Sequence, residues 1–140
     1  MSEALDAAAR ALTRRDRSEA DVLEVLRRKG VSENEAVEAV ETLRRLGAVD
    51  DERFAVAGAA SLAERGYGDA AIAFRLEREG VSRELAERAV SALEPETERA
   101  RQLVARRGAT TKTARWLASR GFAQDSVEAA IAEGEGAELG

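Results

Sequence analysis

The segment Arg27-Arg28-Lys29-Gly30-Val31-Ser32-Glu33 decides the fold, because it returns fifty positions later as Glu77-Arg78-Glu79-Gly80-Val81-Ser82-Arg83. A leucine precedes each copy, at Leu26 and Leu76, and a similar run of small and apolar residues follows each. A weaker third copy is Ser119-Arg120-Gly121-Phe122-Ala123-Gln124. Self-similarity at a fixed period is the signature of a repeat protein. The chain is therefore predicted to consist of one small unit used three times.

The Gly-Val-Ser phrase indicates a turn between two helices. Glycine takes the left-handed conformation that ends a helix at little cost, and serine caps the start of the next helix. Gly30 and Ser32 fit these two roles, and Glu35 would complete a capping box. Gly80 and Ser82 predict the same turn in the second unit. The phrase is therefore interpreted as structural rather than catalytic.

Apolar residues at helical spacing predict three helices in each unit. Further helix starts are predicted at Ser18 and Asp50, and Pro95 marks a boundary between units. The predicted fold is all-α, an elongated array of three tandem three-helix repeats over residues 1–48, 49–94 and 95–132. Residues 133–140 are acidic and rich in glycine, so we expect a disordered tail.

Composition excludes several classes of chemistry. Cysteine and histidine are both absent from the 140 residues, which excludes disulfides, thiolate nucleophiles and Cys/His zinc sites. No apolar stretch reaches the ~18 residues of a membrane span, and the acidic N-terminus does not resemble a signal peptide. We expect a cytoplasmic monomer that binds no cofactor and no metal. The acids Asp50-Asp51-Glu52 are interpreted as helix capping rather than as a metal site.

The net charge of −5 conceals a strong asymmetry. Residues 96–121 carry seven bases and two acids, whereas residues 122–140 carry five acids and no base. A basic helix with little ion-pair compensation usually faces an anionic partner. The alternative is a solvated face that keeps the protein soluble. A second basic cluster is Arg14-Arg15-Asp16-Arg17, which is either a partner contact or a solvated turn.

Several phrases resemble the bacterial RecX family when they are taken in order. They are Leu12-Thr13-Arg14-Arg15-Asp16-Arg17-Ser18, Leu46-Gly47-Ala48-Val49-Asp50-Asp51-Glu52-Arg53-Phe54-Ala55, Arg65-Gly66-Tyr67-Gly68 and Leu117-Ala118-Ser119-Arg120-Gly121-Phe122. The resemblance covers about residues 4–131. It implies a non-catalytic regulator, mainly an inhibitor, of the RecA recombinase. Such a protein binds the groove of the RecA filament on single-stranded DNA and modulates ATP hydrolysis, strand exchange and the coprotease activity of the SOS response.

Two departures from the family pattern bear on nucleic-acid binding. Ala48-Val49 replaces a common aromatic residue before the Asp-Asp pair. The helix after Gly68 begins Asp69-Ala70-Ala71-Ile72-Ala73-Phe74, where basic residues are common in the family. This nearly uncharged run argues against nucleic-acid binding by the second repeat. Weak direct DNA binding by other parts of the chain remains part of the prediction.

The candidate contacts with RecA or DNA are mostly arginines from the basic clusters. Tyr67 is a candidate as an exposed ring between two glycines, with a tyrosine packed over the turn as the alternative. Trp116 could stack on a base, but a core role is the favoured interpretation. The predicted set is Arg14, Arg15, Arg17, Arg65, Tyr67, Arg99, Arg106, Arg107, Lys112, Arg115 and Arg120.

Two other classes of function find less support in the sequence. A sequence-specific DNA-binding protein could use the helix-turn-helix-like turns, but its recognition helices would begin with acids such as Glu33, Glu35 and Asp125. An enzyme would need paired carboxylates or Lys/Arg/Ser chemistry, and no glycine-rich phosphate loop follows a predicted strand. We therefore predict a regulator and no catalytic site.

Overall fold

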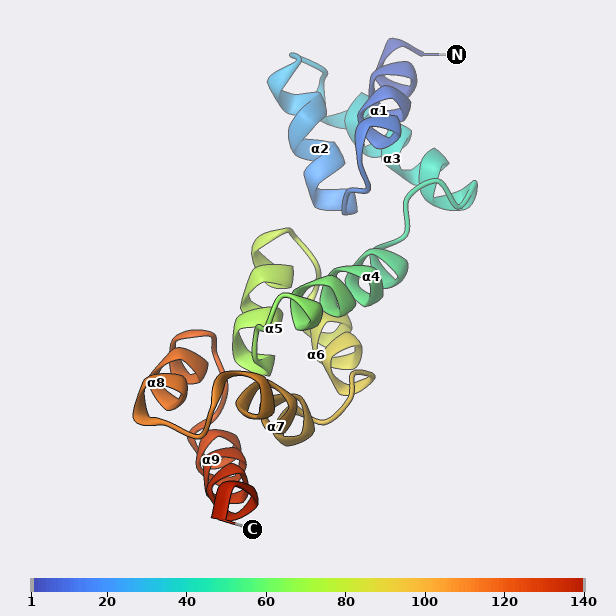
Figure 1. The fold of residues 1–140 in the computed structure, drawn as a ribbon. Coiled ribbons are helices and arrows are strands. Elements are labelled where there is room, and N and C mark those ends of the chain that lie inside the picture. Colours follow the sequence, from blue (N-terminus) through green and yellow to red (C-terminus); the bar gives the residue numbers. More distant parts are fainter. Residues whose placement is uncertain (1, 140) are drawn as a thin grey trace.

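The protein is an elongated array of helices with its two termini at opposite ends (Figure 1). The computed structural model describes residues 2–139, with side chains described through residue 137. Over these residues the chain forms nine α-helices and no strand, which confirms the all-α prediction. The helices are α1 (Glu3–Arg14), α2 (Glu19–Arg28), α3 (Glu33–Arg45), α4 (Asp51–Glu64), α5 (Asp69–Arg78), α6 (Arg83–Ser91), α7 (Glu96–Arg107), α8 (Thr111–Ser119) and α9 (Gln124–Leu139).

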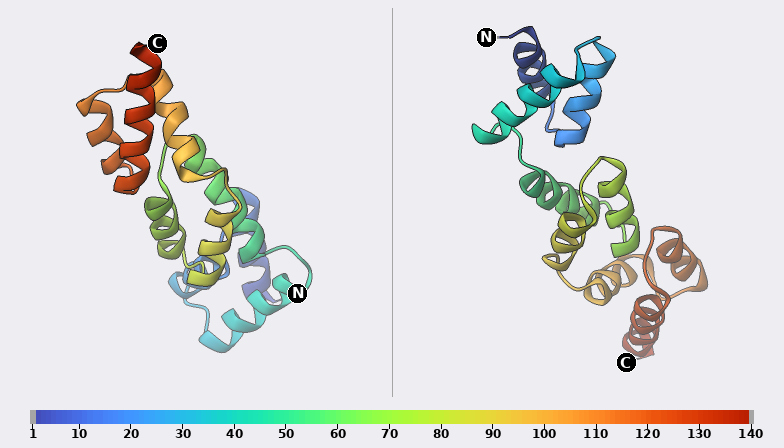
Figure 2. Two further views of the ribbon diagram at one scale, coloured as in Figure 1. Left: turned by 90° about the horizontal axis from the view of Figure 1, so that it is seen from below. Right: turned by 180° about the vertical axis from the view of Figure 1, so that it is seen from behind.

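Each group of three helices has its own hydrophobic core, and Figure 2 shows the three groups following one another along the array. Leu26 is central to the first core, Leu76 occupies the matching place in the second, and Leu117 does so in the third. All three leucines are at most 2% exposed. The repeat seen in the sequence is therefore a repeat of buried side chains.

The predicted turns form as the sequence indicated. Gly30, Gly80 and Gly121 have φ angles of 83°, 95° and 90°, in the left-handed region that favours glycine. Ser32 and Ser82 each accept a hydrogen bond from the backbone N–H three residues on, as an N-cap does. The predicted caps at Ser18 and Asp50 form in the same way.

Adjacent repeats are joined by two hydrogen bonds at equivalent positions in both junctions. The first bond runs from the residue that precedes the second helix of one repeat to a carbonyl in the next repeat. The Ser18 hydroxyl donates to the carbonyl of Glu79, and the Gly68 N–H donates to the carbonyl of Arg120 at 2.8 Å. Glu79 and Arg120 each precede the left-handed glycine of the turn in their repeat.

The second bond uses a carboxylate on the first residue of the next repeat's first helix. Asp51, which begins α4, accepts from the Glu19 N–H at 2.8 Å. Glu96, which begins α7, accepts from the Asp69 N–H at 2.7 Å. Each of these two carboxylates therefore accepts a hydrogen bond from the first backbone N–H of the second helix of the preceding repeat. That N–H has no partner within its own helix.

Glycines bring the second and third repeats into backbone contact. A Cβ atom on Gly68 would lie 2.4 Å from the Phe122 nitrogen, and one on Gly121 would lie 2.5 Å from the Ala71 Cβ. No other residue type fits these positions without displacing backbone. The second glycine of Gly66-Tyr67-Gly68 is therefore explained by the junction between repeats.

The predicted disorder after residue 132 is wrong, because α9 continues to Leu139 and covers residues 133–139; residue 140 lies outside the described part. Glu133 forms an ion pair with Arg101 of α7. A Cβ on Gly134 would lie 2.6 Å from a Val104 methyl and 3.0 Å from the Ala109 Cβ, so this glycine lets α9 pack closely on α7. The acidic, glycine-rich composition predicted disorder, but Gly134 allows close helix packing and Glu133 pairs with Arg101.

Candidate partner-binding site

The candidate residues divide into those used at the junction between repeats and those left facing solvent. Arg99 belongs to the first group and corrects the prediction, since its residue is only 8% exposed. Its guanidinium donates to Asp69 at 2.7 Å, to the Tyr67 carbonyl at 2.9 Å and to the Glu94 carbonyl at 3.2 Å. It therefore fastens the second repeat to the third and is not available to a partner.

Tyr67 and Arg120 also lie at this junction. The Arg120 guanidinium stands 3.8 Å from the centre of the Tyr67 ring and donates a hydrogen bond to the Arg65 carbonyl. Arg75 lies 4.2 Å from the centre of the same ring. Tyr67 is half-buried, so the alternative interpretation of a tyrosine packed over the turn describes it better than an exposed contact does.

Trp116 continues this stack into the third repeat. Its ring centre lies 5.3 Å from the Arg120 guanidinium and 3.6 Å from that of Arg107. Guanidinium groups and rings therefore alternate across the junction, and each such contact is favourable through the quadrupole of the ring. We call Arg75, Tyr67, Arg120, Trp116 and Arg107 the arginine–aromatic row.

The first basic cluster is partly used for local structure. Arg17 donates to the Ala11 carbonyl at 3.0 Å and pairs with Asp21 at 2.8 Å, with only 14% of its side chain exposed. Arg15 also pairs with Asp21, at 3.2 Å, but 53% of its side chain is exposed. Arg14 is exposed at the end of α1. Arg14 and Arg15 therefore remain available to a partner, whereas Arg17 holds the turn.

The turn between α7 and α8 carries a group of exposed bases. Arg106 and Arg107 end α7, and Lys112 and Arg115 lie in the first half of α8. Among the residues whose side chains are described, no carboxylate lies within ion-pair distance of any of the four. We call these four residues the α7–α8 basic corner. Their charge is uncompensated, which suits an anionic surface.

A groove of about 1030 Å³ crosses the middle of the array and takes lining residues from all three repeats. Arg15 contributes from the first repeat and Ser119 from the third, while α4 and α5 of the second repeat form most of its wall. We call it the three-repeat groove. The residues that characterise it are Arg15, Leu62, Arg65, Phe74, Arg75 and Arg78.

Three of these residues, Phe74, Arg75 and Arg78, were not among the predicted contacts. The first half of α5 is nearly uncharged, and its bases come in the last turn. Phe74 is 61% exposed although it is a large apolar residue, and that exposure is visible only once the helix is packed. The second repeat therefore presents a basic surface at the groove, beside the nearly uncharged first half of α5.

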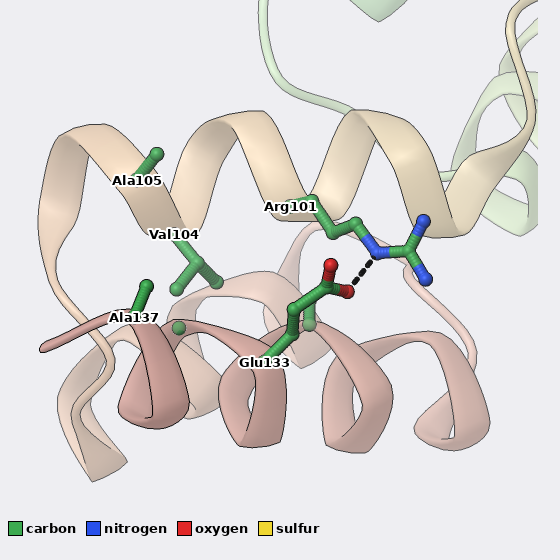
Figure 3. Close-up of a pocket in the computed structure, with 7 residues that line it drawn as sticks. Arg101, Val104, Ala105, Glu133 and Ala137 are labelled. Atoms are coloured by element: carbon green, nitrogen blue, oxygen red, sulfur yellow. Dashed lines mark ion pairs between the residues drawn. The ribbon is translucent and has the colours of Figure 1, made fainter. Parts of the chain in front are cut away.

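A second hollow lies between α7 and α9, with a volume of about 380 Å³ (Figure 3). Val104, Ala105 and Ala137 give it apolar walls, and the Arg101–Glu133 ion pair closes one side. Figure 3 shows Val104 of α7 pointing toward α9, and Glu133 and Ala137 of α9 pointing toward α7. Because Arg101 and Glu133 already pair with each other, they offer no free charge to a ligand. We therefore interpret the hollow as a result of how α7 and α9 pack.

Neither shifted pKa values nor metal ligands mark a site among the candidate residues. Burial raises the pKa of Asp51 above its ordinary value, because the carboxylate is partly desolvated at the first junction. Among the described residues, no set of three or more acidic side chains is placed to hold a metal ion. The helices of residues 2–139 all fall short, in length or in apolar character, of what crossing a bilayer requires.

The first two repeats each match a protein-family model. Residues 4–43 match the model described as RecX, first three-helix domain, and residues 50–90 match RecX, second three-helix domain. The Regulatory protein RecX of Xanthomonas oryzae pv. oryzae is 34% identical over 129 residues, covering 85% of this chain and 81% of that protein. The Regulatory protein RecX of Thermobifida fusca is 40% identical over 107 residues, covering 74% and 57%.

Solved structures share the fold. The crystal structure of RecX from Lactobacillus salivarius superposes with a TM-score of 0.83 at 20% identity and covers 95% of each chain. A crystal structure of regulatory protein RecX gives a TM-score of 0.77 at 20% identity, over 90% of this chain and 70% of that one. The agreement over nearly the whole chain shows that the array of three-helix groups is common to these proteins.

Proposed function

Because this chain belongs to the RecX family of regulatory proteins, we propose that it binds the RecA filament on single-stranded DNA and restrains its activities. The family is regulatory rather than catalytic, so the effect comes from binding. The activities restrained are ATP hydrolysis, strand exchange and the coprotease activity that triggers the SOS response. RecA is the partner that the family implies, and its filament is an elongated target.

The observation that carries the proposal is the three-repeat groove together with the α7–α8 basic corner. Both present arginines without carboxylate partners among the described side chains, and residues from all three repeats line the groove. An extended array distributes its contacts over several turns of a long partner. Modules that bridge neighbouring filament subunits would oppose the subunit movements that accompany ATP hydrolysis.

Weak direct contact with DNA belongs to the same proposal and is assigned to the α7–α8 basic corner. Arg106, Lys112 and Arg115 are exposed and unpaired by the described carboxylates, as a phosphate-facing surface requires. The net charge of −5 opposes tight binding to free DNA. We therefore expect phosphate contacts to matter within the filament more than with naked DNA.

The alternative of a helix-turn-helix-like DNA-binding protein gains no support at the candidate recognition helices. Glu33, at the start of α3, is exposed and accepts bonds from Arg27 at 2.7 and 3.0 Å. This pairing lowers the pKa of Glu33, so the carboxylate stays charged where DNA phosphates would lie. Nanomolar binding to duplex DNA in a gel shift would favour this alternative.

ATP hydrolysis tests the proposed function directly. RecA, single-stranded DNA and ATP are mixed with increasing amounts of this protein, and the rate of hydrolysis is measured. Sub-stoichiometric protein is expected to lower the rate, since one bridging molecule constrains several subunits. Unchanged hydrolysis at saturating protein would refute the proposal.

A further inference from the structure

Resting on the proposed function, we infer that the three-repeat groove binds an acidic segment of the protein partner, anchored by apolar side chains between its carboxylates. The occupant is therefore polypeptide, and DNA contacts lie elsewhere. Four properties of the groove carry this assignment: an apolar floor, a basic rim, guanidinium groups held by rings, and too few free aromatic faces for nucleic acid.

The floor of the groove is the seam between α4 and α5. Phe54, Leu62 and Leu76 line it, and Leu76 is only 2% exposed. Gly58 lets the two helices approach, since a Cβ there would lie 2.9 Å from a Leu76 methyl. A seam of this kind accepts apolar side chains, whose burial is worth about 25 cal/mol per Å² of apolar area.

The rim of the groove is basic. Arg65, Arg75 and Arg78 have no carboxylate within ion-pair distance among the described side chains, and Arg15 keeps half of its side chain exposed beside Asp21. Glu79 is the acid among the residues that line the groove. The charge balance at the rim is therefore positive in a protein whose net charge is −5, and it complements an acidic ligand.

The rings of the groove orient the guanidinium groups and leave their edges free. Arg75 lies 4.2 Å and Arg65 lies 5.5 Å from the centre of the Tyr67 ring. Arg78 lies 5.8 Å from the centre of the exposed Phe74 ring. A guanidinium stacked on a ring still presents its N–H groups at the edge, where they bind carboxylates in pairs.

The same stacking argues against nucleic acid as the occupant. Binding of single strands relies on aromatic faces on which successive bases stack. Guanidinium groups already lie over Tyr67 and Trp116, and Phe74 is the one exposed aromatic side chain in the described part of the chain. One exposed ring above an apolar seam, with Arg78 5.8 Å from its centre, fits contact with a peptide side chain better than a run of bases.

Photo-crosslinking identifies the occupant in the intact complex. Phe74 is replaced by p-benzoyl-phenylalanine in the full chain, the variant is bound to RecA filaments, and crosslinked peptides are identified by mass spectrometry. The matched control carries the same group at Val56, which is 51% exposed and lines a different hollow on α4. We expect a crosslink from position 74, but not from position 56, to a RecA segment with a net negative charge and apolar residues.

The captured segment is then synthesised and its affinity for the wild-type chain is measured by fluorescence anisotropy. Arg75→Glu plus Arg78→Glu is expected to weaken binding at least about tenfold, because two carboxylate contacts become repulsive. Arg75→Lys plus Arg78→Lys keeps the charge and is expected to bind the segment within a few-fold of the wild-type affinity in the same assay. Retained binding by this variant would show that the loss in the glutamate variant is electrostatic rather than a failure to fold.

The two hypotheses fail in different ways. Crosslinks from position 74 to DNA alone, or to a basic RecA segment, would overturn the peptide assignment while inhibition of ATP hydrolysis leaves the proposed function in place. Inhibition of hydrolysis without any crosslink from position 74 would overturn the assignment as well. Absence of inhibition, together with absence of binding to the filament, would overturn the proposed function itself.

Discussion

Arg99 and Asp69 are thirty positions apart in the chain, and the Arg99 guanidinium donates to the Asp69 carboxylate at 2.7 Å across the junction of the second and third repeats. The same guanidinium reaches two backbone carbonyls, those of Tyr67 and Glu94. One nearly buried side chain therefore satisfies three acceptors. The junction is polar at its centre, so its stability depends on every member being present.

Arg99→Ala is expected to lower the free energy of unfolding by about 2 kcal/mol, since it leaves two carbonyls and a half-exposed carboxylate without their partner. Urea unfolding followed by circular dichroism measures the change. Arg101→Ala on the same helix is the control, because Arg101 is exposed and its ion pairs with Glu98 and Glu133 lie in solvent. Equal losses for the two variants would contradict the junction's role.

Gly68→Ala is expected to destabilise the junction by about 2 kcal/mol through overpacking. The φ angle of Gly68 is −85°, which alanine adopts freely, so the cost comes from contact of the new Cβ with the Phe122 and Gly121 backbone. Hydrogen exchange at the residue-68 amide, which donates to the Arg120 carbonyl, should become faster. Gly136→Ala is the control, because a Cβ there meets nothing within 4 Å; it should not destabilise the protein.

Tyr67→Leu is expected to cost about 1 kcal/mol by removing the ring on which Arg75 and Arg120 lie. Tyr67→Phe keeps the ring and should change stability much less. Trp116 is the single tryptophan of the chain and belongs to the same row, so its fluorescence during urea unfolding reports the change. A loss for Tyr67→Phe as large as for Tyr67→Leu would show that the hydroxyl, not the ring, matters.

Asp51→Asn should alter the pH dependence of stability in a defined direction. Burial raises the pKa of Asp51 above 3.8, so the folded state holds its proton more tightly than the unfolded state does. The stability from this group is therefore fully present below pH 3.8 and is lost as the pH rises through the raised value. Asparagine keeps an oxygen for the Glu19 N–H and does not titrate.

The stability of Asp51→Asn relative to the wild type is thus expected to increase as the pH rises from below 3.8 towards neutrality. Urea unfolding of both proteins at closely spaced pH values measures this difference. A difference that stays constant with pH, or falls as the pH rises, would contradict the assignment of the raised pKa to the buried carboxylate.

Arg106→Glu plus Arg115→Glu is expected to weaken binding to RecA filaments at least about tenfold, because it reverses two exposed charges of the α7–α8 basic corner. Arg107 is left in place since it also lies on Trp116. A pull-down with filaments on single-stranded DNA measures the loss. Arg28→Glu plus Arg45→Glu makes the same charge change in the first repeat, and equal retention of both variants would remove the corner from the binding surface.

Local pattern was sufficient to predict the helices and turns. Gly30 and Gly80 end helices, and Ser32 and Ser82 begin them, because capping depends on a few neighbouring residues. The spacing of apolar residues likewise identified the buried faces. The exception is residues 133–139, where composition predicted disorder and packing on α7 produced a helix.

The candidate site was predicted less well, because exposure of a charged side chain is a property of the assembled repeats. Arg99 and Arg106 lie on the same helix and have the same side chain, yet one is buried at a junction and the other is exposed. Phe74 and Arg78 line a groove only because α4 and α5 pack together beside Arg15.

The sequence by itself determined the three-helix unit and its repetition, since both follow from short-range periodicity and caps. Only the tertiary structure decided which arginines hold the repeats together and which remain for a partner. The physical reason is that Arg99 is buried because acceptors from the preceding repeat meet its guanidinium, and those acceptors, on Asp69 and Tyr67, lie 30 and 32 positions away in the sequence.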